Sequence, residues 1–210
     1  MPQQVRNLAA PNLPVAPVQY EQRYQDQFAN VMRLYFQSVS NNVNAPKPFG
    51  SFYDTTTQTN PVANAVNLMK VNSTYDSTNG AQFNVAIKNG TQIQVGETAA
   101  YNIQFSAQLD KVGGGNTNVY IWLRVNGVSI PNSASKMVIA GPNDEKIAAW
   151  NWMILLNAGD YFEIAWSSPS TDTVLLAVAA SGSVPEIPSV IVTVAWVSNV
   201  PASAPAIRNT

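Results

Sequence analysis

The stretch AAYNIQFSAQLDKVGGGNTNVYIWLRVNGVSI, residues 99–130, decides the fold class of this chain. Its first eleven residues alternate apolar side chains, such as Tyr101, Ile103 and Phe105, with neutral polar ones, which is the period of a half-buried strand. Three consecutive glycines interrupt the run, and a second segment rich in β-branched and aromatic residues follows over 119–125. Asn126-Gly127 closes that segment with a dipeptide typical of hairpin turns. Two long strands separated by turn residues predict antiparallel sheet.

The rest of the chain after residue 48 repeats this pattern of short strands and turn residues. The predicted strands cover 50–53, 65–71, 82–88, 91–95, 99–109, 119–125, 129–133, 137–139, 147–156, 161–166, 173–180 and 189–197. Asn89-Gly90 is a second hairpin dipeptide, placed between the segments 82–88 and 91–95. Roughly ten short strands with frequent turns are typical of a β-sandwich or a jelly roll.

Residues 20–44 have the period of a helix instead. Apolar side chains recur there at intervals of three and four residues and form one stripe. The stripe consists of Tyr24, Phe28, Val31, Met32, Tyr35 and Val39. Pro46 and Pro48 follow the segment, and proline does not continue a helix. Such a stripe must be buried, either on the β-domain of its own chain or against copies of itself in a short coiled coil or bundle.

The first eighteen residues are rich in proline, with Pro11, Pro14 and Pro17 at intervals of three. This spacing favours an extended arm, which is either loose or orders on a partner. We therefore expect an anchoring arm over 1–19, a helix and linker over 20–46, a jelly-roll domain over 47–200 and a tail over 201–210. The start of the chain does not resemble a secretory signal, and no window is apolar enough to span a membrane.

The composition argues against several classes of partner. Charged residues make up 11% of the 210 residues, below the roughly 25% of an average domain, and the net charge is −1. A chain without a basic surface is a poor candidate for binding nucleic acid or an anionic membrane. Solubility must rest on neutral polar side chains.

The sequence contains neither cysteine nor histidine. Disulfides, thiolate nucleophiles, zinc fingers and histidine-based catalysis are therefore excluded. The carboxylates of the β region are scattered and mostly lie at turns; Asp144-Glu145 lacks the spacing of a calcium loop. A carbohydrate hydrolase using Asp160 and Glu163 is the one enzymatic alternative. We expect no catalytic residue, cofactor or metal ion.

The aromatic residues of the predicted strands are candidates for the core or for an interface between subunits rather than for a sugar-stacking platform. They are Tyr101, Phe105, Trp122, Trp150, Trp152, Tyr161, Trp166 and Trp196.

Four segments, AAYNIQFSAQL, VYIWLRVNG, AAWNWMILLNAGDYFEIAW and PSVIVTVAWV, occur in an order that resembles the C1q/TNF-like jelly roll. In that family a glycine commonly precedes the tyrosine of the first segment, and here Ala100 occupies that position before Tyr101. The resemblance also implies a hairpin in the segment that contains Gly159-Asp160. The resemblance implies an antiparallel jelly-roll sandwich that assembles as a compact homotrimer.

The segment YEQRYQDQFANVMRLYFQSV is similar to a helix that opens many virion structural proteins of tailed bacteriophages. The residues that carry the match are Tyr20, Tyr24, Asn30, Arg33, Leu34, Tyr35 and Phe36. The resemblance implies a virion protein, assembled in the host cytoplasm, whose arm and helix contact capsid or tail proteins. A trimeric capsid-decorating protein or head fibre is expected. A receptor-binding tail knob that contacts a host glycan and a C1q-like lectin are the alternatives.

Overall fold

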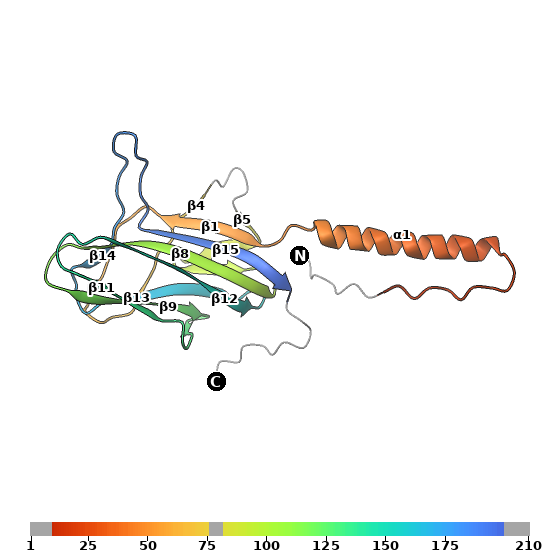
Figure 1. Cartoon of the computed structure of the whole chain (residues 1–210), viewed down its shortest axis with the longest axis horizontal. Coiled ribbons are helices and arrows are strands. Elements are labelled where there is room, and N and C mark those ends of the chain that lie inside the picture. Colours follow the sequence, from red (N-terminus) through yellow and green to blue (C-terminus); the bar gives the residue numbers. More distant parts are fainter. Residues whose placement is uncertain (1–9, 76–81, 200–210) are drawn as a thin grey trace. The chain divides into compact units, whose positions relative to one another are not determined.

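The computed structural model describes residues 10–75 and 82–199, and within them the chain forms one helix and fifteen strands (Figure 1). The chain divides into two compact units, Met1–Pro46 and Lys47–Thr210. The tail expected over 201–210 and the first nine residues of the expected arm lie outside the described residues.

The strands of the second unit form two antiparallel sheets, which stack face to face (Figure 1). The eight-stranded sheet contains β1 (Phe49–Asp54), β2 (Gln58–Thr59), β4 (Ser73–Thr74), β5 (Gln82–Phe83), β8 (Ala99–Lys111), β12 (Lys146–Leu156), β14 (Thr173–Leu175) and β15 (Val190–Asn199). The seven-stranded sheet contains β3 (Asn67–Leu68), β6 (Val85–Lys88), β7 (Gln92–Val95), β9 (Thr117–Val125), β10 (Val128–Ser129), β11 (Ser135–Ile139) and β13 (Tyr161–Ser167).

The order of the longer strands identifies a jelly roll. In one sheet the neighbours run β1-β15-β8-β12, and in the other they run β7-β13-β9-β11. The chain passes from one sheet to the other between β7 and β8, between β8 and β9, between β11 and β12, and between β12 and β13. This winding of consecutive strands across two sheets is that of a jelly roll. The predicted fold class, an antiparallel jelly-roll sandwich preceded by one amphipathic helix, is confirmed.

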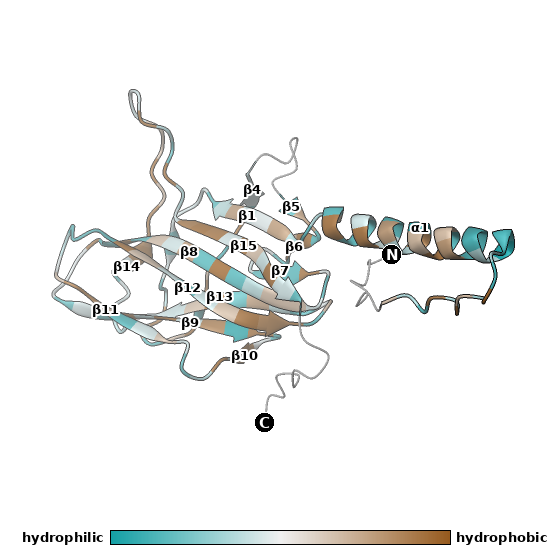
Figure 2. Cartoon of the chain, turned by 45° about the vertical axis from the view of Figure 1, so that its right-hand side comes forward, coloured by the Kyte–Doolittle hydropathy of each residue, from teal (hydrophilic) through white to brown (hydrophobic). Residues whose placement is uncertain are grey.

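The core lies between the two sheets, because each long strand turns alternate side chains inward. Along β8, Tyr101 and Ile103 are fully buried while Gln104 is exposed, and Figure 2 shows the corresponding alternation of hydropathy along the strands. Phe162 and Trp166 of β13 meet them from the opposite sheet. Burial of this continuous apolar layer is the main stabilising contribution to the sandwich.

Both predicted hairpin turns are present. β6 and β7 pair around Asn89-Gly90, and β9 and β10 pair around Asn126-Gly127. The φ angles are 50° and 70° in the first turn and 49° and 79° in the second. Positive φ at both central residues is the requirement of a type I′ turn, which asparagine followed by glycine meets at low cost.

The two long strands predicted over 99–109 and 119–125 do not pair with each other. β8 lies in the eight-stranded sheet and β9 in the seven-stranded one, so the glycine-rich segment between them crosses from sheet to sheet. The turn at Gly159-Asp160 likewise joins β12 to β13 of the opposite sheet, so the hairpin expected there is wrong. The physical reason is that two strands with one apolar face each can bury these faces in two ways. They can lie next to each other in one sheet, or they can lie in two sheets that pack face to face.

Four predicted strands are shorter than expected, and one of them, 129–133, reduces to β10. The segment 82–88 breaks at Asn84, whose φ of 54° interrupts the ladder between β5 and β6. The segment 65–71 reduces to β3, and 173–180 ends at Leu175 with β14. The residues after Leu175 are apolar but leave the sheet, because alternation alone does not reveal whether a neighbouring strand is present.

The first unit contains the helix α1 (Gln22–Asn44) and the described part of the arm, which has no regular secondary structure. Ala45 ends the helix in an extended conformation, as expected of a residue before proline. None of the 23 helical residues is buried, and the six stripe residues are only half-buried. Arm residues Leu13 and Pro14 line a shallow hollow together with Val31 of the helix.

Candidate functional site

Three of the predicted aromatic residues come together at the side of the sandwich where the edge strands β12 and β11 lie. The ring centroids of Phe105 and Trp150 are 4.6 Å apart in an edge-to-face arrangement, and those of Phe105 and Trp152 are 5.2 Å apart and stacked. The indole N–H of Trp152 donates to the carbonyl oxygen of Ser133 at 3.1 Å. We call Phe105, Trp150 and Trp152 the aromatic cluster. Phe105 is part of the buried core, and Trp150 and Trp152 pack against that core.

The other predicted aromatic residues do not join this cluster. Tyr101 and Trp166 are buried in the core. Trp196 lies at an irregularity of β15, where the ammonium group of Lys47 is 5.1 Å from the centre of its ring. The remaining two are half-buried: Trp122 points to the outer face of the seven-stranded sheet, and Tyr161 begins β13 beside the turn at Gly127. The eight predicted aromatic residues are therefore distributed over several parts of the sandwich and do not form one site.

The hydroxyl group of Tyr101 is a buried polar group with one partner. It donates to the carbonyl oxygen of Glu97 at 2.8 Å. Burial and the nearby negative charge of Glu97 raise the pKa of Tyr101, while the hydrogen bond to the backbone opposes them. Tyr101 is therefore a protonated structural residue.

β12 forms an exposed edge of the eight-stranded sheet. Throughout the described part of the chain, this eleven-residue strand pairs only with β8. Ile147 and Met153 project from it with 64% and 65% of their surfaces exposed. A long edge strand with exposed apolar residues is a site at which another chain can pair or pack.

The outer face of the eight-stranded sheet contains a patch without charged residues, which extends over its four longest strands. Three rows of four residues cross it in register, one residue from each of β12, β8, β15 and β1. The rows are Ala149, Ser106, Ile191 and Tyr53; Asn151, Gln104, Thr193 and Ser51; and Met153, Asn102, Ala195 and Phe49. All twelve are exposed or half-buried. We call this surface the uncharged face; a protein surface can cover it without desolvating an ion.

The outer face of the seven-stranded sheet has a different character. A guanidinium nitrogen of Arg124 lies 3.5 Å from the carboxylate of Glu163, which is 4% exposed. Asp160, the other acid of the hydrolase alternative, accepts hydrogen bonds from the Asn126 side chain at 2.9 Å and from the backbone of Asn157 at 2.8 Å. Both carboxylates therefore hold the local structure.

The turn at Asp144 also has a structural explanation. Its carboxylate accepts a hydrogen bond from the backbone N–H of Ala140 at 2.6 Å and lies 3.3 Å from the ammonium group of Lys146. The hydrogen bond, and secondarily Lys146, lower the pKa of Asp144. Over residues 10–75 and 82–199, no group of three potential metal ligands is assembled. Among the same residues, no helical segment combines the length and apolar character needed to cross a membrane.

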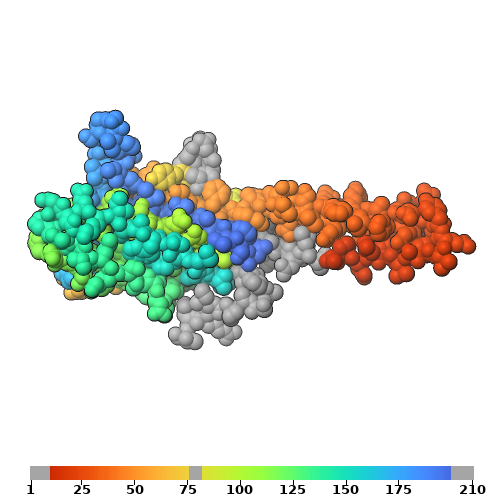
Figure 3. Space-filling model, viewed as in Figure 1, coloured from red at the N-terminus to blue at the C-terminus, as the bar shows by residue number. Residues whose placement is uncertain are grey.

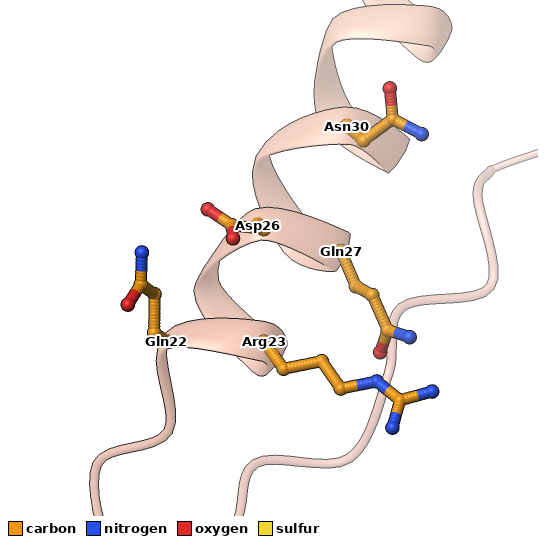
Figure 4. Close-up of a pocket in the computed structure, with 5 residues that line it drawn as sticks. All are labelled: Gln22, Arg23, Asp26, Gln27 and Asn30. Atoms are coloured by element: carbon orange, nitrogen blue, oxygen red, sulfur yellow. The ribbon is translucent and has the colours of Figure 1, made fainter.

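The N-terminal half of α1 carries a shallow polar hollow (Figure 4). Gln22, Arg23, Asp26, Gln27 and Asn30 line it, and their side chains project in different directions rather than toward one point. The hollow therefore lacks the convergent groups of a small-molecule site.

Residues 176–188 form a narrow projection from the sandwich, which we call the finger (Figure 1). Backbone hydrogen bonds join Val178 to Ile187 and Ser181 to Val184, and Gly182 occupies the tip with a φ of 61°. Every residue from 178 to 187 is exposed. The finger was not predicted from the sequence, although two prolines, Pro185 and Pro188, mark a segment unsuited to a central strand.

No protein-family profile and no curated protein matches the sequence. A solved structure described as Eiger TNF from S. frugiperda is similar to this chain with a TM-score of 0.47 and 8% sequence identity. The similarity covers 77% of this chain and 100% of that one.

Proposed function

We propose that this chain is a non-enzymatic structural protein that assembles as a homotrimer on a phage virion, as a capsid-decorating protein or head fibre. The helix carries this proposal. It is 23 residues long and buries none of them. Helices in proteins owe most of their stability to the packing of an apolar face, and this face is only half-covered within its own unit. Three copies of the stripe can cover one another.

The uncharged face and the β12 edge support assembly of the β-unit as well. Interface cores are depleted in charged residues, as this face is. Ile147 and Met153 add exposed apolar surface along the free edge. A neighbouring copy that covers the edge also removes the hazard that an open strand poses for aggregation.

The assignment to a virion rests on the resemblance of the helix segment to phage structural proteins. Tyr20, Leu34 and Phe36 belong to the matching residues and are 80%, 51% and 59% exposed. Tyr20 precedes the helix, and Leu34 and Phe36 lie on it outside the stripe. A helix that uses the stripe for self-association therefore still leaves these three side chains available. Capsid or tail proteins are the partners we propose for them and for the arm.

Light scattering on the full chain tests the assembly. We expect a mass of three times 22.7 kDa. Phe28→Glu should lower the mass if the helix gathers the chains, and Gln37→Glu, on the exposed side of the helix, is its control. Gln104→Lys on the uncharged face should lower the mass if the sheets associate, with Asn118→Lys on the other sheet as control. A full-length monomer at micromolar concentration would contradict the trimer.

A receptor-binding tail knob or a C1q-like lectin is the second candidate, and the exposed finger favours it. A loop held on a rigid sandwich is a common place for a recognition surface. Attachment of the purified chain to empty capsids supports the decorating role. Binding to host-surface glycan without attachment to capsids supports the knob or the lectin. Failure of both assays would contradict both candidates.

A further inference from the structure

A groove separates the finger from the edge of the eight-stranded sheet at β1 and β4. Figure 3 shows the finger standing clear of the neighbouring surface of the sandwich. The groove has a volume of about 600 Å³, within the range of roughly 300–1,000 Å³ that is typical of small-molecule sites. Its walls come from the end of β1 and the residues after it, from Tyr75 beyond β4, and from both strands of the finger.

Two tyrosines form one wall of this groove. The ring centroids of Tyr53 and Tyr75 are 4.5 Å apart, with their planes inclined by 43°. Tyr75 is 40% exposed. Burial and the neighbouring Tyr53 raise the pKa of Tyr75, so the Tyr75 hydroxyl is a neutral donor and acceptor at physiological pH. A wall of this kind offers apolar ring surface together with hydroxyl groups.

The remaining lining residues are three polar ones and six apolar ones. The polar residues are Thr55, Thr57 and Glu186, and the apolar residues are Ala177, Val178, Ala179, Pro185, Ile187 and Pro188. Glu186 is exposed on the finger and forms no ion pair with any described residue. The hydroxyl oxygens of Thr55 and Thr57 accept hydrogen bonds from Asn72 and from the backbone of Ala177, at 3.2 and 3.1 Å. The Thr57 O–H donates back to the carbonyl oxygen of Ala177 at 3.5 Å, which leaves the Thr55 O–H to donate to a ligand.

The base of the groove is firmly held. The backbone of Ser189 donates to the carbonyl oxygen of Asp54 at 2.9 Å, and the Gln58 side chain donates to the Ser189 hydroxyl at 3.2 Å. At the other end of the finger, the backbone N–H of Leu176 donates to the carbonyl oxygen of Gln108 at 2.7 Å, so both ends are attached to the sheet. A ligand in the groove would meet walls whose separation is largely set in advance, which reduces the entropic cost of binding.

The lining selects a ligand class. No lysine or arginine lines the groove and Glu186 is its one charged residue, so a phosphate, sulfate or carboxylate ligand would be repelled. A purely apolar ligand would leave the carboxylate and hydroxyl groups without partners. A pyranose ring presents C–H groups on its faces and hydroxyls around its rim, which matches aromatic rings beside a carboxylate.

We propose that the groove between Tyr53, Tyr75 and Glu186 binds a neutral hexopyranose unit of a glycan. The tyrosines pack on the ring face, and Glu186 accepts hydrogen bonds from two adjacent sugar hydroxyls. One protomer supplies the whole groove, so this inference does not depend on a virion. Tyr53 also belongs to the uncharged face, so the inference requires that a neighbouring copy leaves the β1 side of that face open.

The test begins with the full chain on an array that contains neutral glycans, acidic glycans and proline-rich peptides. The methyl glycoside of the neutral sugar retained is then titrated calorimetrically. Tyr75→Ala and Glu186→Gln should each lower the affinity about tenfold or more, as the loss of a stacking surface or of a charged hydrogen-bond acceptor does.

Matched controls separate binding from folding. Tyr120→Ala removes a tyrosine of nearly the same exposure, 39%, from β9, and Glu145→Gln removes another exposed carboxylate. Both should bind within about twofold of the unaltered chain, a difference well below the effect of one hydrogen bond. If Tyr75→Ala fails to fold, Tyr75→Phe keeps the ring and should retain binding, while Glu186→Gln still loses it. Retention of only acidic glycans, of only peptides or of nothing overturns the proposal, as does binding unchanged by Glu186→Gln.

Discussion

The sandwich and the helix differ in where their apolar residues go. Phe162 of the sandwich is fully buried, whereas Phe28 of the helix is half-buried and Phe36 is 59% exposed. The sandwich satisfies its apolar residues within one chain. The helix has the same kind of residue at regular spacing but lacks a surface to cover it within the first unit. The sandwich therefore contains a buried apolar core, whereas the first unit leaves its apolar stripe half-covered.

A second contrast lies within the sandwich, between its two outer faces. The seven-stranded sheet carries the Arg124–Glu163 ion pair on its outside, and the eight-stranded sheet presents the uncharged face. Charge costs little in water but much when it is covered. The Glu163 carboxylate is only 4% exposed and is paired with Arg124 within the chain. The uncharged face differs in that another protein can cover it without desolvating an ion.

Truncating the core should produce the largest effect. Phe162→Ala is expected to lower the free energy of unfolding of the sandwich by about 3–5 kcal/mol, because it leaves a cavity in a packed interior. Phe28→Ala should lower it by less than about 0.5 kcal/mol, as substitutions outside the core usually do. Urea unfolding followed by tryptophan fluorescence measures both. Equal losses would erase the contrast between the two units.

Alkaline pH should weaken the sandwich through Tyr101. Its pKa is raised in the folded state, so the folded chain holds this proton more tightly than the unfolded chain does. The stabilisation is complete below the unfolded value of about 10 and is lost as the pH rises above it. Tyr101→Phe should reduce the fall in the urea midpoint above about pH 10. Tyr20→Phe, which removes an 80% exposed phenol, should leave that fall unchanged.

A smaller effect is expected at the hairpin between β6 and β7. Gly90 has a φ of 70° with nothing within 4 Å of an added Cβ, so Gly90→Ala should cost about 1 kcal/mol through backbone strain alone. Gly115→Ala, also in open space but without a positive φ, is the control and should be nearly neutral. Thermal unfolding of the two variants measures the difference. A Gly90→Ala variant as stable as the control would argue against the left-handed turn.

The smallest effect is expected at Asp144. Its lowered pKa stabilises the fold above the unfolded value and the contribution is lost as the pH falls through the folded one. Solvent screens this exposed carboxylate, so Asp144→Asn should leave the melting temperature at pH 7 unchanged within error. A clear loss at neutral pH would show that the turn before β12 contributes more than its exposure suggests.

Local patterns in the sequence predict the elements well where one residue type dictates one conformation. Asn89-Gly90 and Asn126-Gly127 form the expected turns, because few other residues accept positive φ at two successive positions. The helix stripe is also visible from spacing alone, and all six of its residues are half-buried. The finger was missed because the apolar residues 176–180 have the composition of a strand but lack a neighbour in either sheet.

The sequence by itself determined the class of each segment: an amphipathic helix, alternating strands, tight turns and the absence of cysteine and histidine chemistry. Each follows from interactions between residues close along the chain. Only the tertiary structure decided which strands are partners, since β8 and β9 face each other across the core although they are consecutive. It also brought Tyr53, Tyr75 and Glu186 together across more than one hundred residues. Such pairings depend on how apolar faces stack in three dimensions, which local periodicity does not encode.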